Sequence, residues 1–141
     1  MNQETSPARL YAGLVGAVLV VAGIIGFFYS ASFGSPGDVD DVFGILSVNA
    51  WHNVVHLATG ALGLLAYSAG ARASKTYAWG LGVVYIAVAI WGFIIGSGDS
   101  ILGLVPVNIE DNVLHLIIGA LGLAAGAVSP ATAAGTRPAE V

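Results

Sequence analysis

Four long apolar stretches set the limits on what this chain can fold into. They lie near residues 10–30, 49–70, 77–96 and 112–128. Each approaches the ~20 residues that a helix needs to cross the hydrocarbon core of a bilayer, and the fourth is the shortest. Only 9% of the 141 residues are charged, whereas a soluble domain carries about 25%. The chain is therefore predicted to be an all-α, polytopic membrane protein with four transmembrane helices.

The few charged residues are sorted by loop. All four cations precede the first stretch, join the second to the third, or follow the fourth: Arg9, Arg72, Lys75 and Arg137. The other two loops contain no Lys or Arg and hold the acids Asp38, Asp40, Asp41, Asp99, Glu110 and Asp111. Because cationic loops stay in the cytoplasm, both termini are predicted to be cytoplasmic, in a multi-pass protein of the plasma membrane.

Composition excludes several classes of function. There is no cysteine, so disulfides and thiolate metal sites are ruled out. The net charge is −4 and there is no basic patch, so no nucleic acid is expected as a partner. The expected surroundings are the lipid bilayer, with a homo-oligomer or a larger membrane complex as further possibilities.

The chain contains an internal duplication. Residues 43–66 repeat as residues 102–125 at a constant spacing of 59, which aligns His56 with His115 and two asparagines and two glycines with their copies. The first and third stretches align at a spacing of 66, for example Gly26 with Gly92. We therefore predict one domain made of two tandem hairpins, residues 9–72 and 73–128, flanked by cytoplasmic tails, residues 1–8 and 129–141. A pseudo-two-fold axis along the membrane normal would relate the hairpins in an antiparallel four-helix bundle.

Both copies carry a polar and glycine-rich stripe on one helical face. At 100° per residue the stripe of the second stretch is Asn49, His52, Asn53, His56, Gly60 and Gly63, and that of the fourth is Asn108, Asp111, Asn112, His115, Gly119 and Gly122. Polar side chains in a membrane face the bundle interior, and small residues mark close helix packing. The second and fourth stretches are therefore predicted to meet along these stripes.

This meeting would bring three imidazoles and one carboxylate toward one point. His52 and His56 are four residues apart, as are Asp111 and His115, so each pair projects from one side of its helix. Such a donor set suits a transition-metal ion, Zn, Fe, Cu or Ni, bound near the outer surface. Around the ligands we expect Asn49, Asn53, Asn108 and Asn112, with Asn53 and Asn112 bonding ring N–H groups. Asn49 and Asn108 also stand where helix N-caps are expected.

Other interpretations of the same residues remain open. His56 and His115 could be the axial ligands of a haem b, although a tight glycine crossing would leave no gap for the macrocycle. The polar groups could instead only hydrogen-bond the helices together, in a non-catalytic accessory or structural subunit. An enzyme is not favoured, because no second functional group stands beside a substrate-sized opening.

Two further expectations concern the ends of the stretches. Apolar residues in the two acidic loops, such as Phe43 and Leu102, are expected to lie in the membrane interface as short amphipathic pieces. Tyrosines near the ends of the stretches, Tyr11 and Tyr77 among them, are expected in the interfacial aromatic belt.

The duplicated motif resembles a known family. The patterns are Gly44-x-x-x-Val48-Asn49-x-x-His52-Asn53-x-x-His56-Leu57 and Val107-Asn108-x-x-Asp111-Asn112-x-x-His115-Leu116. Over about residues 12–127 they are similar to a group of small prokaryotic four-helix membrane proteins known as domain of unknown function DUF4383. The resemblance implies the four-span topology and a prokaryotic source, and it implies that the ionisable residues of the motif are characteristic of the group. It implies no activity.

Overall fold

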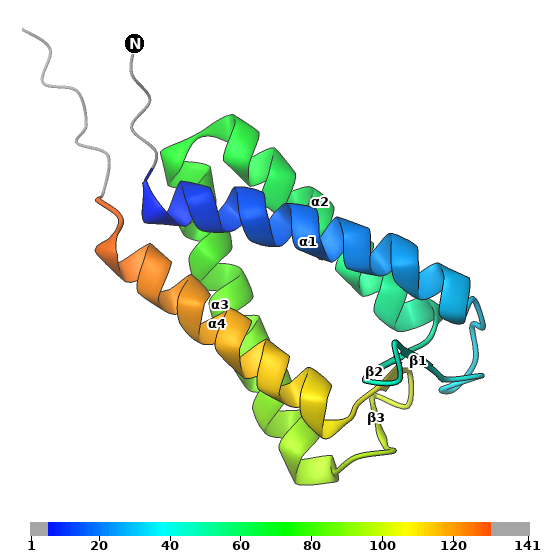
Figure 1. Cartoon of the computed structure of the whole chain (residues 1–141). Coiled ribbons are helices and arrows are strands. Elements are labelled where there is room, and N and C mark those ends of the chain that lie inside the picture. The colour runs from blue at the N-terminus through cyan, green and yellow to red at the C-terminus, as the bar shows by residue number, and fades with distance from the viewer. Residues whose placement is uncertain (1–5, 131–141) are drawn as a thin grey trace, which may run out of the picture.

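The computed structural model describes residues 6–130, which form four helices and two small β-hairpins (Figure 1). The helices are α1 (Pro7–Tyr29), α2 (Ala50–Ala69), α3 (Ala71–Ile95) and α4 (Ile109–Val128). The strands are β1 (Asp40–Val42), β2 (Leu46–Val48), β3 (Ser100–Ile101) and β4 (Val105–Pro106). Within residues 6–130, helices and these hairpins are the regular elements, so the fold is all-helical apart from the hairpins. Residues 1–5 and 131–141, most of the two predicted tails, lie outside the described residues.

Local signals account for the helix boundaries. Ser6 caps α1 and Pro7 opens it, a position where the missing proline N–H costs nothing. A single residue, Gly70, separates α2 from α3 and has a φ of 107°, a backbone conformation that glycine adopts readily. Because that turn is so short, α3 begins at Ala71, and the expected hairpin boundary between residues 72 and 73 falls in its first turn.

The helices pack most extensively within two antiparallel pairs, α1 with α2 and α3 with α4. Glycines allow both approaches: a Cβ on Gly60 would lie 2.7 Å from the carbonyl oxygen of Gly16, and one on Gly119 would lie 3.0 Å from that of Gly82. The prediction that the glycine stripes join α2 to α4 is therefore wrong, because α2 and α4 make at most marginal backbone contact. The stripes face α1 and α3 instead.

Tyrosines connect the two helix pairs. Tyr11 of α1 donates a hydrogen bond to the carbonyl of Ile118 in α4 (2.9 Å), and Tyr77 of α3 donates to the carbonyl of Thr59 in α2 (3.0 Å). A Cβ on Gly63 would lie 2.7 Å from the Tyr77 ring, so this glycine makes room for the tyrosine. Tyr11 belongs to the core and Tyr77 packs against it, rather than either lying in an interfacial belt.

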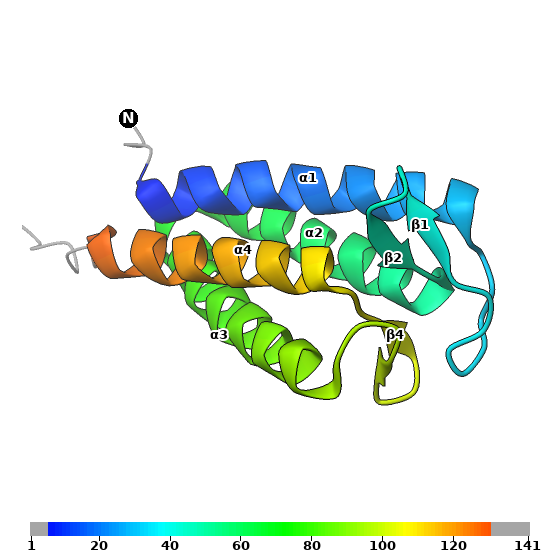
Figure 2. The same cartoon turned by 60° about the horizontal axis from the view of Figure 1, so that its bottom comes forward.

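The two acidic loops form β-hairpins, not amphipathic pieces. β1 pairs with β2 and β3 with β4, both antiparallel. The chain reverses at Phe43 and Gly44, and again at Leu102 and Gly103, which all have positive φ values between 54° and 70°. Both hairpins lie at one end of the bundle, which we call the hairpin end, where the two helix pairs splay apart (Figures 1 and 2).

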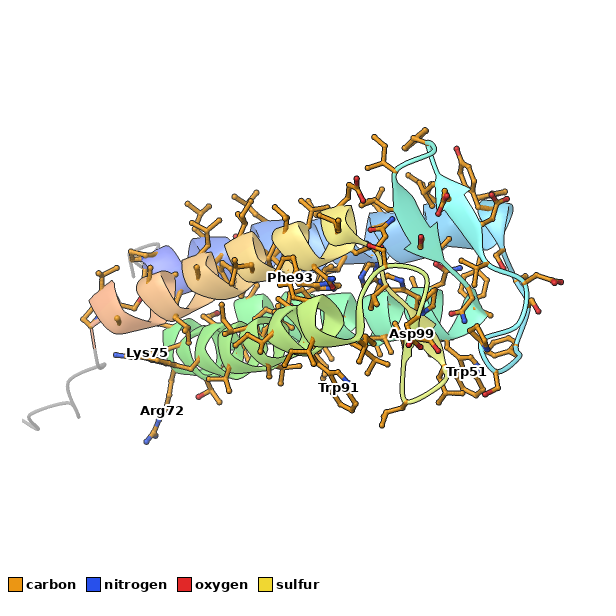
Figure 3. All side chains as sticks on the ribbon, turned by 90° about the horizontal axis from the view of Figure 1, so that it is seen from below. Trp51, Arg72, Lys75, Trp91, Phe93 and Asp99 are labelled. Atoms are coloured by element: carbon orange, nitrogen blue, oxygen red, sulfur yellow. The ribbon has the colours of Figure 1, made fainter. Side chains whose placement is uncertain are left out.

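The outer surface is apolar, which indicates a lipid bilayer environment. Large side chains such as Phe28 (86% exposed) and Ile94 (77%) project away from the core. Helices α1, α3 and α4 are each long and apolar enough to cross a membrane. Helix α2 is not among these, because polar residues occupy much of its first half. Charges separate by end: Arg72 and Lys75 lie opposite the hairpin end, where Asp99 lies (Figure 3).

Candidate metal centre

The three histidines of the chain converge near the hairpin end. His52 and His56 project from α2 and His115 from α4, and one nitrogen of each ring lies within 4.8 Å of the other two. His52 and His115 are buried, with 2% and 8% exposure, and His56 is half-buried. The predicted convergence is therefore present for the imidazoles, although α2 and α4 do not pack against each other. Long side chains bridge the space between the helices.

The orientation of His52 is set by groups on both sides of its ring. The side-chain oxygen of Asn49 caps α2 by accepting from the backbone N–H of His52 (2.9 Å). Nδ1 of His52 lies 2.9 Å from the carbonyl oxygen of Ser47. A carbonyl can only accept, so Nδ1 carries the proton and Nε2 of the neutral ring presents a lone pair. That Nε2 lies 3.1 Å from Nε2 of His56.

These distances are close to those of a tetrahedral metal site. Zinc–imidazole bonds of about 2.0–2.1 Å place two nitrogen ligands about 3.3 Å apart. The His52 and His56 nitrogens, at 3.1 Å, already satisfy this. The widest separation within the triad is no more than 4.8 Å. A shift of about 1.5 Å by His115 would complete a three-nitrogen site.

His115 has an incompletely satisfied ring. Tyr85 of α3 packs edge-on against it, with ring centroids 4.8 Å apart. Nδ1 of His115 is buried and makes no hydrogen bond of good geometry, although it lies near the backbone of Asp111 on its own helix. A buried polar atom without a partner costs about 1–3 kcal/mol, so this nitrogen is a local cost of placing His115 here.

The carboxylate of Asp111 does not join the three imidazole nitrogens. It accepts a hydrogen bond from the backbone N–H of Ser47 at 3.0 Å and is not part of the group of converging nitrogens. The same Ser47 peptide segment accepts from His52 through its carbonyl. Asp111 thus fixes the piece of β2 that orients His52, which gives it a supporting position rather than a place among the three imidazoles.

Asn49 and Asn108 cap α2 and α4, as predicted, and also join the two halves of the chain. The amide nitrogen of Asn49 donates to the carbonyls of Pro36 and Leu104, both at 2.6 Å. Asn108 donates to the carbonyl of Ile45 at 2.6 Å. Each asparagine therefore bonds the turn of the opposite hairpin. Asn108 also donates to the hydroxyl of Ser47 at 3.1 Å. Neither asparagine bonds an imidazole ring.

Asn53 and Asn112 lie within the helix pairs, not behind the imidazoles. Asn53 donates to the carbonyl of Ser30 at 2.8 Å. Its side-chain oxygen occupies the space that a Cβ on Gly26 would need. The side-chain oxygen of Asn112 occupies the matching space at Gly92. Neither of these two side-chain oxygens has a hydrogen-bond partner. These amides were expected to bond ring N–H groups of the histidines, but in the structure they do not contact the rings in this way.

Sequence reasoning missed Ser47, which acts through its backbone. One signal was present: the duplication places Pro106 opposite Ser47, and His52 opposite Asp111. Proline has no N–H, so only the first copy can donate to a carboxylate from this strand position. Asp111 belongs to the second copy, and its carboxylate faces the backbone N–H of Ser47 in the first copy. Tyr85, the neighbour of His115, carried no comparable signal.

Comparison with known proteins gives a family and nothing more specific. The family model described as "Domain of unknown function (DUF4383)" matches residues 9–128. No curated protein and no solved structure matches the chain.

Proposed function

We propose that this chain, which belongs to the DUF4383 family, is a small membrane protein that binds one transition-metal ion through His52, His56 and His115. The observation that carries the proposal is the convergence of three imidazole nitrogens within 4.8 Å inside an apolar helix bundle. Imidazole is a good ligand for Zn, and also for Cu, Fe and Ni. A structural, sensing or metal-handling role is consistent with such a site.

The local chemistry favours a metal ligand over a simple hydrogen-bonding role. Ser47 holds His52 in the tautomer whose Nε2 is unprotonated, and a backbone carbonyl bonded to the far ring nitrogen is a usual companion of a metal-binding histidine. The protein supplies three ligands, and the fourth position of a tetrahedral ion would remain for water or a small ligand.

Asp111 is the alternative fourth ligand. To reach the ion, its carboxylate would have to release the N–H of Ser47. That release would also free the strand segment that orients His52, so we assign Asp111 to positioning.

We further propose that all four helices cross the plasma membrane of a prokaryote as two tandem hairpins related by a pseudo-two-fold axis along the membrane normal. Equivalent contacts support this arrangement: Asn53 on Gly26 matches Asn112 on Gly92 at the two repeat spacings. Arg72 and Lys75 lie at the end opposite the acidic hairpins, and Arg9 is in the first turn of α1. Because cationic residues favour the cytoplasmic side, their position supports a cytoplasmic location for that end. The 20 residues of α2 equal the length needed to span the hydrocarbon core, which takes about 20.

A haem b between His56 and His115 has less support. The glycines do not form the tight α2–α4 crossing that would have left no gap for the macrocycle, since they pack within the helix pairs. The structure offers another objection. In a bis-imidazole haem the porphyrin lies between the two axial rings, yet the His52 ring lies 4.4 Å from that of His56 and 6.2 Å from that of His115. The third imidazole occupies the space of the macrocycle.

Elemental analysis of the purified protein tests the metal proposal. We expect about one equivalent of metal per chain, or one equivalent of Zn²⁺ bound on titration after chelation, in a protein without a Soret band. Each single change, His52→Ala, His56→Ala or His115→Ala, should weaken Zn²⁺ binding by about 100-fold or more, because it removes one of three ligands.

Tyr85→Phe is the matched control, since Tyr85 contacts the His115 ring but donates no ligand. It should retain the metal stoichiometry. If the wild-type protein takes up no metal and the histidine variants lose only thermal stability, the histidines serve packing alone, as in an accessory subunit. A Soret band would favour haem instead.

A further inference from the structure

An apolar pocket lies beside the histidine triad and opens to the lipid-facing side of α1. Its volume is about 380 Å³, within the range of small-molecule sites. Helix α1 forms one wall and the β1–β2 hairpin another, and the polar residues of its lining are His56 and Asp111. Figure 2 shows this hairpin lying over the α1 segment that leads to the hairpin end. The half-buried imidazole of the triad is thus the one at the pocket wall.

The mouth of the pocket faces the membrane. Val18 and Val21 line it and are 60% and 53% exposed on α1, a helix apolar enough to span a bilayer. A ligand would therefore arrive from the hydrocarbon phase, and apolar walls select a lipid-soluble molecule.

The polar wall restricts the head group of that molecule. No Lys or Arg is among the residues that line the pocket, so a phosphate would find no cation there. A fatty-acid carboxylate would likewise find no cation among these residues. An imidazole and a carboxyl together can donate to and accept from a neutral oxygen. The chemistry matches a neutral lipid-soluble molecule whose head bears a carbonyl or hydroxyl.

The α1 wall of this pocket differs in sequence from the matching segment of α3. At the spacing of 66, the pocket residues Ala17, Ala22 and Ile25 correspond to Val83, Val88 and Trp91 of α3. These three counterparts are larger, whereas Val18 corresponds to an identical Val84 and Val21 to the smaller Ala87. The small side chains of Ala17 and Ala22 contribute to the space that the pocket occupies.

We propose that this pocket binds a neutral, membrane-dissolved molecule of the quinone or quinol type, with its polar head against His56 and Asp111 and its tail along α1. The inference goes beyond metal binding and does not require it, because the walls are formed by side chains of the protein alone.

Calorimetric binding of decylubiquinone tests the proposal, with the full chain in phosphatidylcholine nanodiscs. The variant A17V/A22V/I25W installs the residues of the second repeat and should weaken binding by about tenfold or more, the scale of a clash in a filled site. Leu14→Trp, a matched change at a lipid-exposed α1 position outside the pocket, should bind as the wild type does. Val21→Trp provides a second pocket-filling variant if the triple variant does not fold.

The metal assay is run on the same samples, so the two proposals fail separately. Saturable quinone binding to chelator-treated protein that takes up no Zn²⁺ keeps the pocket and rejects the metal site. Quinone binding that is equal in wild-type and pocket-filled protein, or absent from the wild type, overturns the pocket proposal. Displacement by oleate at the same concentration as by a neutral quinol would show that an acyl chain is the occupant, and would also overturn it.

Discussion

A few buried side chains determine how the hairpin end is held together, and Asn49 is the clearest of them. It is fully buried, and both its side-chain oxygen and its side-chain nitrogen form hydrogen bonds. Its oxygen caps α2, and its nitrogen reaches the carbonyls of Pro36 and Leu104. One side chain therefore fixes the start of a helix and the position of the other repeat's hairpin.

Two substitutions at Asn49 separate these functions. Asn49→Ala removes the cap and both donated bonds, and should lower the free energy of unfolding by about 2–3 kcal/mol. Asp is as good a cap as Asn, but a carboxylate would face two carbonyl oxygens. We therefore expect Asn49→Asp to be at least as destabilising as Asn49→Ala, measured by thermal unfolding in detergent. Wild-type stability of Asn49→Asp would mean that capping is the only function of the residue.

The assignment of Asp111 to positioning makes a separable prediction. Asn at this position still accepts from the N–H of Ser47, whereas Ala does not. Asp111→Asn should keep the Zn²⁺ affinity within about threefold, and Asp111→Ala should weaken it by about tenfold. Titration of chelator-treated protein with Zn²⁺ gives both values. Equal, large losses in the two variants would instead identify the carboxylate as a ligand.

The glycines determine how closely the helices of each pair approach each other. Gly16 and Gly60 bring the backbones of α1 and α2 together, and Gly82 and Gly119 do the same for α3 and α4. These contacts build each hairpin and leave α2 and α4 apart. The histidine side chains are long enough to meet in the remaining space, so the site depends on the glycines for its width.

Alanine substitution tests this division among glycines. A Cβ on Gly82 would lie 3.0 Å from the backbone oxygen of Gly119, so Gly82→Ala should destabilise the protein by about 1–3 kcal/mol. Gly80, two residues away in α3, has no atom within 4 Å of its would-be Cβ. Gly80→Ala should be neutral or stabilising by up to about 1 kcal/mol. Thermal unfolding of the two variants under identical conditions compares them, and equal effects would argue against close packing at Gly82.

Basic and acidic side chains lie at opposite ends of the molecule. Lys75 donates to the carbonyl of Ser129 at 2.6 Å, and Arg9 donates to that of Tyr67 at 3.2 Å, so these cations also satisfy carbonyls at helix C-termini. The acidic residues, including Asp40 and Asp99, lie with the hairpins at the other end. This end-to-end separation is the basis of the proposed orientation.

The absence of cysteine from the sequence makes the orientation easy to measure. Single variants Asp40→Cys and Asp99→Cys should react with a membrane-impermeant maleimide in intact cells, since both lie at the proposed outer surface. Arg72→Cys should react only after the membrane is opened. The wild-type chain is the unlabelled control. Labelling of Arg72→Cys in intact cells, with protection of the two hairpin positions, would reverse the topology.

Patterns within single segments were sufficient to predict much of this molecule. Apolar stretches predicted four helices, and Asn49 and Asn108 were correctly predicted as their caps. The duplicated motif led to the family that the comparison confirms. The polar stripes led to the prediction that His52, His56 and His115 converge, although the close α2–α4 packing on which it depended is not present. Each of these properties depends on local periodicity or on the cost of a polar group in lipid.

Only the tertiary structure decided which partner each face meets. A glycine stripe indicates a close helix neighbour, but nothing in its spacing says whether α4 or α1 is that neighbour. Asp111 has the spacing of a ligand beside His115, yet its carboxylate is taken by an N–H of Ser47 in a distant strand. Backbone donors are the same in every residue except proline, so the only mark of this one in the sequence is Pro106 at the position that matches Ser47. Only the tertiary structure therefore showed that Asp111 is placed to support His52 and not among the converging imidazoles.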